Sequence, residues 1–135
     1  MPNFKVISMA ELFVIDTFAW IEYFIGSKRG EKVMEFIETK KSITPTIVIA
    51  ELCAKYSKDG EKFDEKIKFV MHCTNLANLD YSIAESSGRI HTEQRKKIKD
   101  FGIVDSVVYA TALKVNAKVV TGDPHFNNIK ESIII

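Results

Sequence analysis

The sequence has few cysteines and almost no net charge, and each of these features excludes a class of protein. Only Cys53 and Cys73 are cysteines among its 135 residues. They lie far apart, without the spacing of metal ligands or the dense pattern of a secreted disulfide scaffold, so a reducing cytoplasm is the expected compartment. The formal net charge is +1, which indicates neither an acidic tail nor a broadly basic nucleic-acid binder. Any nucleic-acid site must therefore be a local patch.

The chain also lacks a hydrophobic run long enough to span a membrane. Its most apolar stretch, residues 12–25, is interrupted by Asp16 and Glu22 and falls short of the roughly 20 apolar residues that a spanning helix needs. It does not have the order of segments of a signal peptide. We expect no membrane anchor and no export. With no repeat, low-complexity tract or linker, residues 1–135 are expected to form a single domain.

Short strand patterns alternate with longer helical patterns along the chain. Strands are expected at residues 12–15, 42–44, 75–79, 118–121 and 132–135. Helices are expected at residues 17–25, 29–39, 45–58, 61–72, 81–99 and 104–116, with Thr17 and Thr44 as candidate caps and Pro45 as a first helical residue. This order predicts an α/β domain whose mostly parallel sheet is covered by helices on both faces.

Two aspartates lie at the carboxyl ends of predicted strands. Asp16 ends the apolar run at residues 12–15, and Asp123 follows the β-branched run at residues 118–121. In open parallel sheets, ligands bind just beyond the carboxyl ends of the strands, so both carboxylates are candidates for one crevice. Each of them alone is also explained as a turn or cap residue.

Two further acids belong to predicted helices that are largely apolar. Glu51 shares a helical face with Ile47, Val48 and Leu52, and burying an unpaired carboxylate is costly. An ordinary alternative is an exposed ion pair with Lys55, four residues later. Asp105 opens a nearly uncharged helix, where a capping role alone would account for it.

If these four carboxylates meet, their repulsion requires a compensating cation. Oxygen ligands select Mg²⁺ or Mn²⁺ over Zn²⁺, and such a metal activates water for attack on phosphorus. The quartet therefore predicts a metal site for phosphodiester hydrolysis, with one metal or two. His72, His91 and His125 have no zinc spacing, and no catalytic role is expected for them, although His125 follows Asp123 closely.

Four runs in the chain resemble, in the same order, the PIN-domain nucleases and in particular the VapC toxins of prokaryotic toxin–antitoxin pairs. The runs are Val14-Ile15-Asp16-Thr17, Ile49-Ala50-Glu51-Leu52, residues 103–113 around Asp105, and residues 120–126 around Asp123. The resemblance implies a three-layer α/β/α domain that binds Mg²⁺ or Mn²⁺ through Asp16, Glu51, Asp105 and Asp123 and cleaves single-stranded RNA. It also implies that Thr121 orients a carboxylate or a water, with a lesser supporting role for Thr17.

The same resemblance implies an antitoxin protein as partner and a homodimer or higher homo-oligomer, with helices near the N-terminus at the interfaces. Two features depart from the family pattern. About a dozen residues precede Asp16 where a few are usual, so residues 1–11 are a candidate extension and Met9 a candidate start. The additional acid that family members often carry near Asp123 is replaced here by Pro124 and His125.

The segment before Asp105 is basic and is a candidate RNA-binding edge, because phosphate contacts supply affinity without sequence specificity. Its members are Arg89, Arg95, Lys96, Lys97 and Lys99. The alternative is a solvated helix face. Lys28, Arg29 and Lys32 form a weaker second patch, and the aromatic residues at 18–24 are expected in the core and in dimer contacts.

Three functions remain open on the sequence alone. The leading one is an endoribonuclease toxin. The second is a housekeeping RNA-processing or structure-specific nuclease with the same site. The third is a non-catalytic RNA-binding or protein-binding module, which the intact acidic quartet disfavours. A phosphorylated receiver domain fits less well, because it needs paired acids after the first strand and Asp16 is followed by Thr17.

Overall fold

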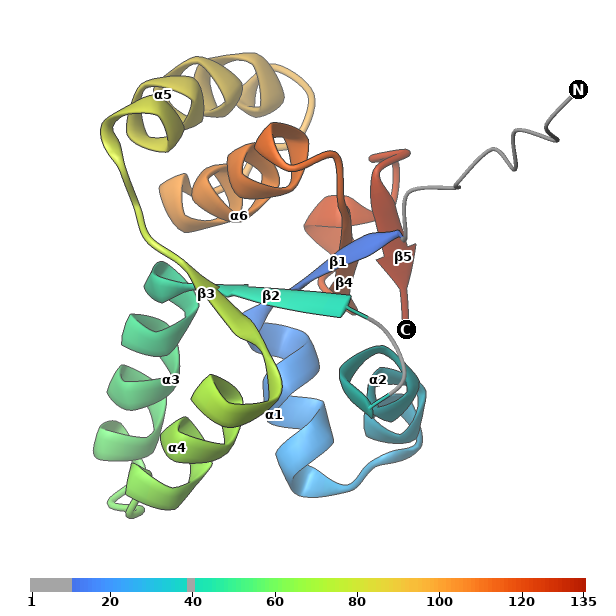
Figure 1. Cartoon of the computed structure of the whole chain (residues 1–135). Coiled ribbons are helices and arrows are strands. Elements are labelled where there is room, and N and C mark those ends of the chain that lie inside the picture. Colours follow the sequence, from blue (N-terminus) through green and yellow to red (C-terminus); the bar gives the residue numbers. More distant parts are fainter. Residues whose placement is uncertain (1–10, 39–40) are drawn as a thin grey trace, which may run out of the picture.

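The computed structural model describes residues 11–38 and 41–135, and its centre is a parallel β-sheet (Figure 1). Within these residues the sheet has five strands in the order β3-β2-β1-β4-β5, and every neighbouring pair is parallel. The strands are β1 (Leu12–Ile15), β2 (Lys41–Pro45), β3 (Asn75–Ala77), β4 (Lys118–Thr121) and β5 (Ser132–Ile134). The predicted parallel sheet is confirmed. The proposed start at Met9, and all but the last residue of the candidate extension, lie outside the described residues.

Helices cover both sides of this sheet. On one side α6 (Ile103–Lys114) lies against the strands and α5 (Tyr81–Arg95) packs outside it, while α1 to α4 lie on the other side (Figure 1). These are α1 (Thr17–Ile25), α2 (Lys28–Glu38), α3 (Thr46–Lys58) and α4 (Asp64–Cys73). A 3₁₀ turn, η1 (Pro124–Phe126), follows β4. This is the three-layer α/β/α arrangement, as predicted.

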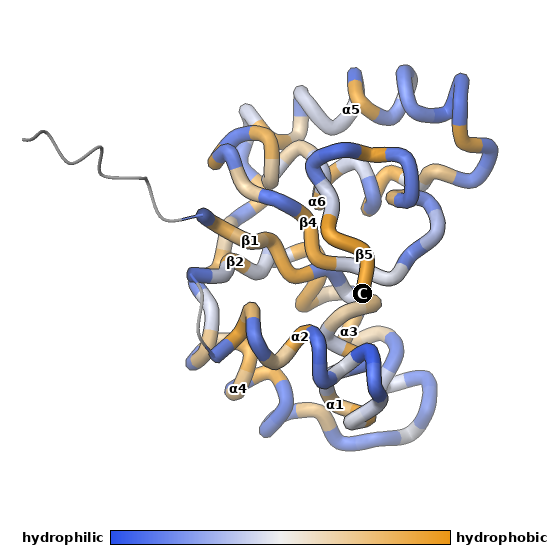
Figure 2. Tube along the Cα trace, turned by 90° about the vertical axis from the view of Figure 1, so that its right-hand side faces the viewer, coloured by the Kyte–Doolittle hydropathy of each residue, from blue (hydrophilic) through white to orange (hydrophobic). Residues whose placement is uncertain are grey.

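The core is formed where the central strands meet the inner helices. Val14 and Ile15 of β1, and Val119 and Val120 of β4, have no exposed surface. The strands are accordingly hydrophobic, whereas the outer helices carry hydrophilic stretches (Figure 2). Strands apolar on both faces are typical of a sheet covered on both sides. None of the described helices has both the length and the apolar character needed to cross a bilayer.

Both predicted helix caps and several predicted helix bounds are wrong. Pro45 still belongs to β2 and precedes α3, with ψ of 139°, and the hydroxyl of Thr44 accepts a hydrogen bond from Trp20 instead of capping a helix. The predicted start of α1 at Thr17 is correct, but the Thr17 hydroxyl donates to Glu51 instead of capping the helix. The helix predicted to reach residue 99 ends at Arg95.

Candidate active site

The parallel pairing of β1 and β4 brings their carboxyl ends together. Val14 lies opposite Val119 and Ile15 opposite Val120, and the backbone amide of Asp16 donates to the carbonyl of Val120. Asp16 and Thr121 therefore lie side by side at the carboxyl edge of the sheet. Glu51 of α3 and Asp105 of α6 lie near the same edge, because the negative charges of both residues act on Asp16.

Asp16 is the most deeply buried acid of the group. Its side chain retains 5% exposure, and the hydroxyl of Thr121 donates to its Oδ2 at 2.8 Å. Burial raises the pKa of the Asp16 carboxyl to about 7, the hydrogen bonds from Thr121 and from the amide of Thr17 oppose this rise, and the negative charges of Asp105 and Glu51 add to it. Burial and the neighbouring negative charges therefore both favour the neutral form of the Asp16 carboxyl.

Glu51 reaches this edge from the first half of α3. Its Oε1 accepts a hydrogen bond of 2.5 Å from the hydroxyl of Thr17. Burial raises the pKa of Glu51, the Thr17 hydrogen bond lowers it, and the charges of Asp105 and Asp123 raise it. The ion pair with Lys55 does not form, because Lys55 pairs with Asp59 at 2.8 Å. An ion pair with Lys55 therefore does not explain the position of Glu51.

Asp105 and Asp123 each also have a local structural role. Asp105 Oδ2 accepts from the backbone amide of Gly102 at 2.9 Å, which ties the residue to the start of α6. Asp123 Oδ1 accepts from the amide of His125 at 2.9 Å and thereby closes the η1 turn, while the amide of Asp123 donates to the hydroxyl of Thr121 at 3.0 Å. These bonds fix both carboxylates in place, and each keeps a partly exposed side chain.

Within the part of the chain that the structure describes, no lysine or arginine forms an ion pair with any of these four acids. The basic side chain that contacts two of these acids is His125, whose Nδ1 lies 3.0 Å from Asp105 Oδ2 and 3.5 Å from Asp123 Oδ1. Asp105, Asp123 and His125 offer ligand atoms that all lie within 4.8 Å of one another. The arrangement is therefore rich in negative charge and suited to hold a divalent cation.

His125 is the residue of this site that the sequence analysis set aside. Its position two residues after Asp123 is the sequence signal that points to it. In the structure the two residues form a tight turn, in which Asp123 accepts from the amide of His125. In such a turn an aspartate side chain accepts from the backbone amide two residues later, and the structure shows in addition that the His125 ring reaches Asp105.

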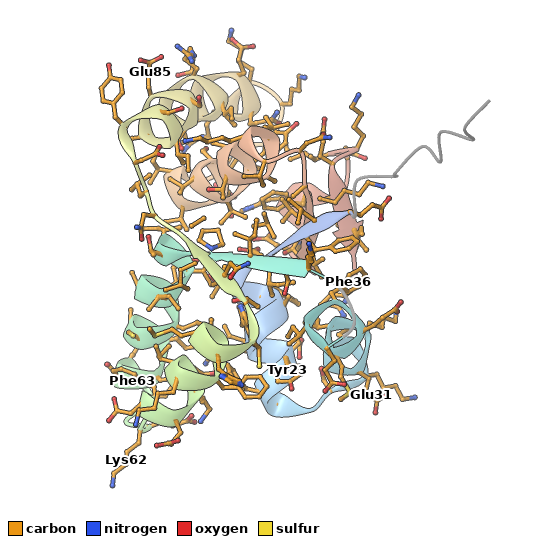
Figure 3. All side chains as sticks on the ribbon, in the orientation of Figure 1. Tyr23, Glu31, Phe36, Lys62, Phe63 and Glu85 are labelled. Carbon is orange, nitrogen blue, oxygen red and sulfur yellow. The ribbon has the colours of Figure 1, made fainter. Side chains whose placement is uncertain are left out.

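The predicted RNA-binding residues separate into two groups. Arg89 pairs with Glu85, which points outward from α5 (Figure 3), and Lys96 pairs with Glu93. Both side chains are largely exposed, Arg89 on α5 and Lys96 directly after its last residue. Lys97 instead lines a cleft of about 430 Å³ together with Tyr109, Lys130 and Glu131. For Arg95 and Lys99 the structure indicates no specific role.

The cleft lined by Lys97 shares the helix α6 with the acidic edge, although none of the four acids lines it. Tyr109 lies four residues after Asp105, and residues at this spacing are neighbours on one face of a helix. The Tyr109 hydroxyl donates to Glu131 at 2.9 Å across one side of the cleft. Burial and this carboxylate raise the pKa of Tyr109 to about 12, so the phenol stays protonated.

Comparison with known sequences gives one family. The model of the PIN domain family matches residues 13–132, a range that contains all four acids, Thr121 and His125. No curated protein matches the chain.

Solved structures with the same fold include several toxin–antitoxin proteins. A toxin–antitoxin complex from Klebsiella pneumoniae aligns with a TM-score of 0.69 at 21% identity, covering 92% of this chain and 96% of that one. VapBC2 from Rickettsia felis, bound to a DNA fragment from its promoter, aligns with 0.70 at 19% identity over 92% and 97%. VapC20 from Mycobacterium tuberculosis, a toxin that cleaves the sarcin–ricin loop, aligns with 0.69 at 13% identity over 87% and 95%. At these identities the likeness establishes the shared fold.

Proposed function

The chain belongs to the PIN domain family, and from this premise we propose that it is a cytoplasmic, Mg²⁺- or Mn²⁺-dependent endoribonuclease, the VapC-like toxin of a toxin–antitoxin pair. Asp16, Glu51, Asp105 and Asp123 are its metal-site acids. Thr121 is the residue that orients Asp16. The substrate is single-stranded RNA, and the partner that restrains the enzyme is an antitoxin protein.

One observation carries this proposal: four carboxylates share one edge of the sheet, and no lysine or arginine among the described residues neutralises them. Such a group is destabilising unless a cation is bound, because burial and mutual repulsion disfavour the charged forms. The donors are mainly carboxylate oxygens, which suit hard divalent ions such as Mg²⁺ and Mn²⁺. The residues present therefore fit a divalent metal site.

When bound, such a metal activates water for attack on phosphorus and stabilises the negative charge that develops on the phosphate. The chain's own residues prepare this site. Thr121 holds Asp16 through Oδ2 and holds the backbone of Asp123 through its amide, so one hydroxyl sets the separation of two acids. Thr17 orients Glu51 in the same manner.

The cleft beside α6 supports the choice of a nucleic-acid substrate. Lys97 and Lys130 line it, and Tyr109, which also lines it, lies four residues after Asp105 on α6. Lysine contacts to phosphates position a strand without reading its sequence. An RNA backbone held along this cleft would arrive at the acids from the side of α6.

The toxin role and the antitoxin partner are supported by the solved structures of the same fold, among them VapBC proteins from Rickettsia felis and Salmonella typhimurium in complexes with DNA. VapC20, with the same fold, is a toxin that cleaves the sarcin–ricin loop. A homodimer remains a proposal that accompanies this role.

The test is cleavage of a labelled single-stranded RNA by the purified chain in Mg²⁺ or Mn²⁺, with a DNA of the same sequence as a second substrate. We expect RNA cleavage, its loss in EDTA, and a loss of at least about 100-fold in Asp16→Asn and Asp105→Asn, since both remove a negative ligand of the metal. Asp100→Asn is the matched control, because Asp100 is an exposed acid close to Asp105 in sequence. Equal activity in all three variants would refute the assigned site.

Expression separates a toxin from a housekeeping nuclease. The wild-type chain should arrest growth of a host cell, the Asp105→Asn chain should not, and co-expression of the protein encoded next to it should restore growth. Growth unaffected by an active enzyme would favour the housekeeping nuclease.

A further inference from the structure

The imidazole of His125 lies between two of the acids. Its Nδ1 is 3.0 Å from Asp105 Oδ2 and 3.5 Å from Asp123 Oδ1. In an octahedral site with metal–ligand distances of about 2.1 Å, neighbouring ligand atoms are about 3.0 Å apart. The two distances from Nδ1 are thus close to the spacing of adjacent ligands, and all three residues offer ligand atoms within 4.8 Å of one another.

The ring of His125 is positioned by its surroundings. His125 is the middle residue of η1, and the next residue, Phe126, is fully buried and packs against Phe101 with ring centroids 5.6 Å apart. The His125 ring lies beside Phe101 as well, at 6.3 Å. On the other side the His125 amide is held by Asp123. The backbone anchored on both sides directs the side chain toward Asp105.

We propose that His125 is a metal ligand through Nδ1, together with Asp105 and Asp123, and that this nitrogen makes the site prefer Mn²⁺ to Mg²⁺. The proposal rests on the proposed metal-dependent function and adds a ligand to it. Imidazole suits transition metals, whereas Mg²⁺ takes oxygen ligands and keeps its waters. The proton of the neutral ring is then on Nε2, and the lone pair of Nδ1 faces the ion.

The competing role for His125 is positioning, in which Nδ1–H donates to Asp105 and the ring never touches the metal. Histidines and carboxylates near metals are often joined in this way. The two roles differ in one observable, which is direct bonding between a ring nitrogen and the metal. Both roles would affect activity, so activity does not distinguish them.

The experiment is pulsed electron paramagnetic resonance of the full chain loaded with Mn²⁺, which detects ¹⁴N coupling from a directly bound imidazole. We expect this coupling in the wild type and its absence in His125→Asn. His72→Asn is the matched control, because His72 is an exposed histidine on α4, and it should keep the signal. Mn²⁺ bound to the wild type without ¹⁴N coupling would overturn the proposal and leave the metal-dependent nuclease intact.

Calorimetric titration of the same proteins gives the second measurement. In His125→Asn the amide oxygen replaces Nδ1, so the ratio of Mn²⁺ affinity to Mg²⁺ affinity should fall by about 10-fold or more. In His125→Ala the Mn²⁺ affinity itself should fall by about 10-fold or more. An unchanged ratio in His125→Asn would overturn the proposal. No saturable binding of either metal to the wild type would instead overturn the proposed function.

Discussion

Asp16 and Thr121 are 105 residues apart in the chain and are joined by a hydrogen bond of 2.8 Å from the threonine hydroxyl to Oδ2 of the carboxylate. The same hydroxyl accepts from the backbone amide of Asp123 at 3.0 Å. Thr121 is fully buried, so water cannot substitute for it. One side chain thus links the ends of β1 and β4 and fixes the separation of two acids.

Replacing Thr121 by valine should impair the reaction more than the fold. The substitution keeps the shape but leaves Asp16 Oδ2 and the amide of Asp123 without this partner, and small displacements of catalytic groups are costly. We expect RNA cleavage to fall by about 10-fold to 100-fold, measured as kcat/KM. Thr121→Ser should recover most of the activity.

The control for Thr121→Val is Thr111→Val on α6. Thr111 is buried like Thr121, but its hydroxyl donates to the carbonyl of Val107 within the helix. Its replacement should lower the melting temperature slightly and leave kcat/KM unchanged. An equal loss of activity in both variants would mean that the effect of Thr121 is one of general stability.

The buried charge of Asp16 should make the metal-free protein less stable as the pH rises. Burial raises the pKa of its carboxyl from 3.8 to about 7, so between these values the folded chain binds more protons than the unfolded chain, and stability falls with rising pH. Below pH 4 this contribution to stability is fully present, and above pH 7 it is lost. Three pKa units correspond to up to about 4 kcal/mol.

Asp16→Asn removes this titration. In EDTA the variant should therefore melt several degrees above the wild type at pH 8 and close to it at pH 4. Mn²⁺ should raise the melting temperature of the wild type at pH 8 and have a much smaller effect on the variant. Thermal unfolding followed by circular dichroism measures this, with Asp100→Asn as control. A wild type and an Asp16→Asn variant with identical pH dependence would contradict the prediction.

The sequence was sufficient for the parts of the site that depend on regular structure. Asp16 follows the apolar strand β1, Asp123 comes two residues after the end of β4, and adjacent parallel strands must end at one edge. Glu51 interrupts an apolar stripe on α3, and the alternative partner Lys55 turns out to pair with Asp59. The β4 bounds were also correct, because the run Lys118–Thr121 is closed by Gly122.

What the sequence could not supply depends on side-chain direction in irregular segments. The contact of His125 with Asp105 requires the η1 turn and the packing of Phe101 on Phe126, two residues 25 positions apart in the sequence. The Thr44-Pro45 pair has the composition of a helix start, but Thr44 is bonded to Trp20 and Thr74 inside the sheet layer. Tertiary contacts overrode local preference in both cases.

The neighbours Lys96 and Lys97 offer a direct test of the RNA path. Lys97 lines the cleft beside α6, whereas Lys96 pairs with Glu93 on the solvated face. Lys97→Ala should weaken binding of a single-stranded RNA by about 3-fold to 10-fold and reduce its salt dependence, as expected for a lost phosphate contact. Lys96→Ala removes the same charge and should change binding little. The measurement is a fluorescence anisotropy titration at two salt concentrations, and equal effects would place the RNA elsewhere.

Phe18 of α1 lies close to Gly122, and this contact is expected to influence the conformation of the neighbouring Asp123. A Cβ added at Gly122 would lie 2.4 Å from Cε1 of Phe18, so in Gly122→Ala either the ring or the backbone leading into Asp123 must move. We expect a loss of about 1–3 kcal/mol in the free energy of unfolding and weaker Mn²⁺ binding. Gly88→Ala, with open space at its Cβ in α5, should stabilise the chain by up to about 1 kcal/mol. In the Phe18→Ala background, Gly122→Ala should lower the free energy of unfolding much less, because the colliding ring is gone. A double-mutant cycle with no interaction energy between the two substitutions would show that Phe18 does not determine the conformation before Asp123.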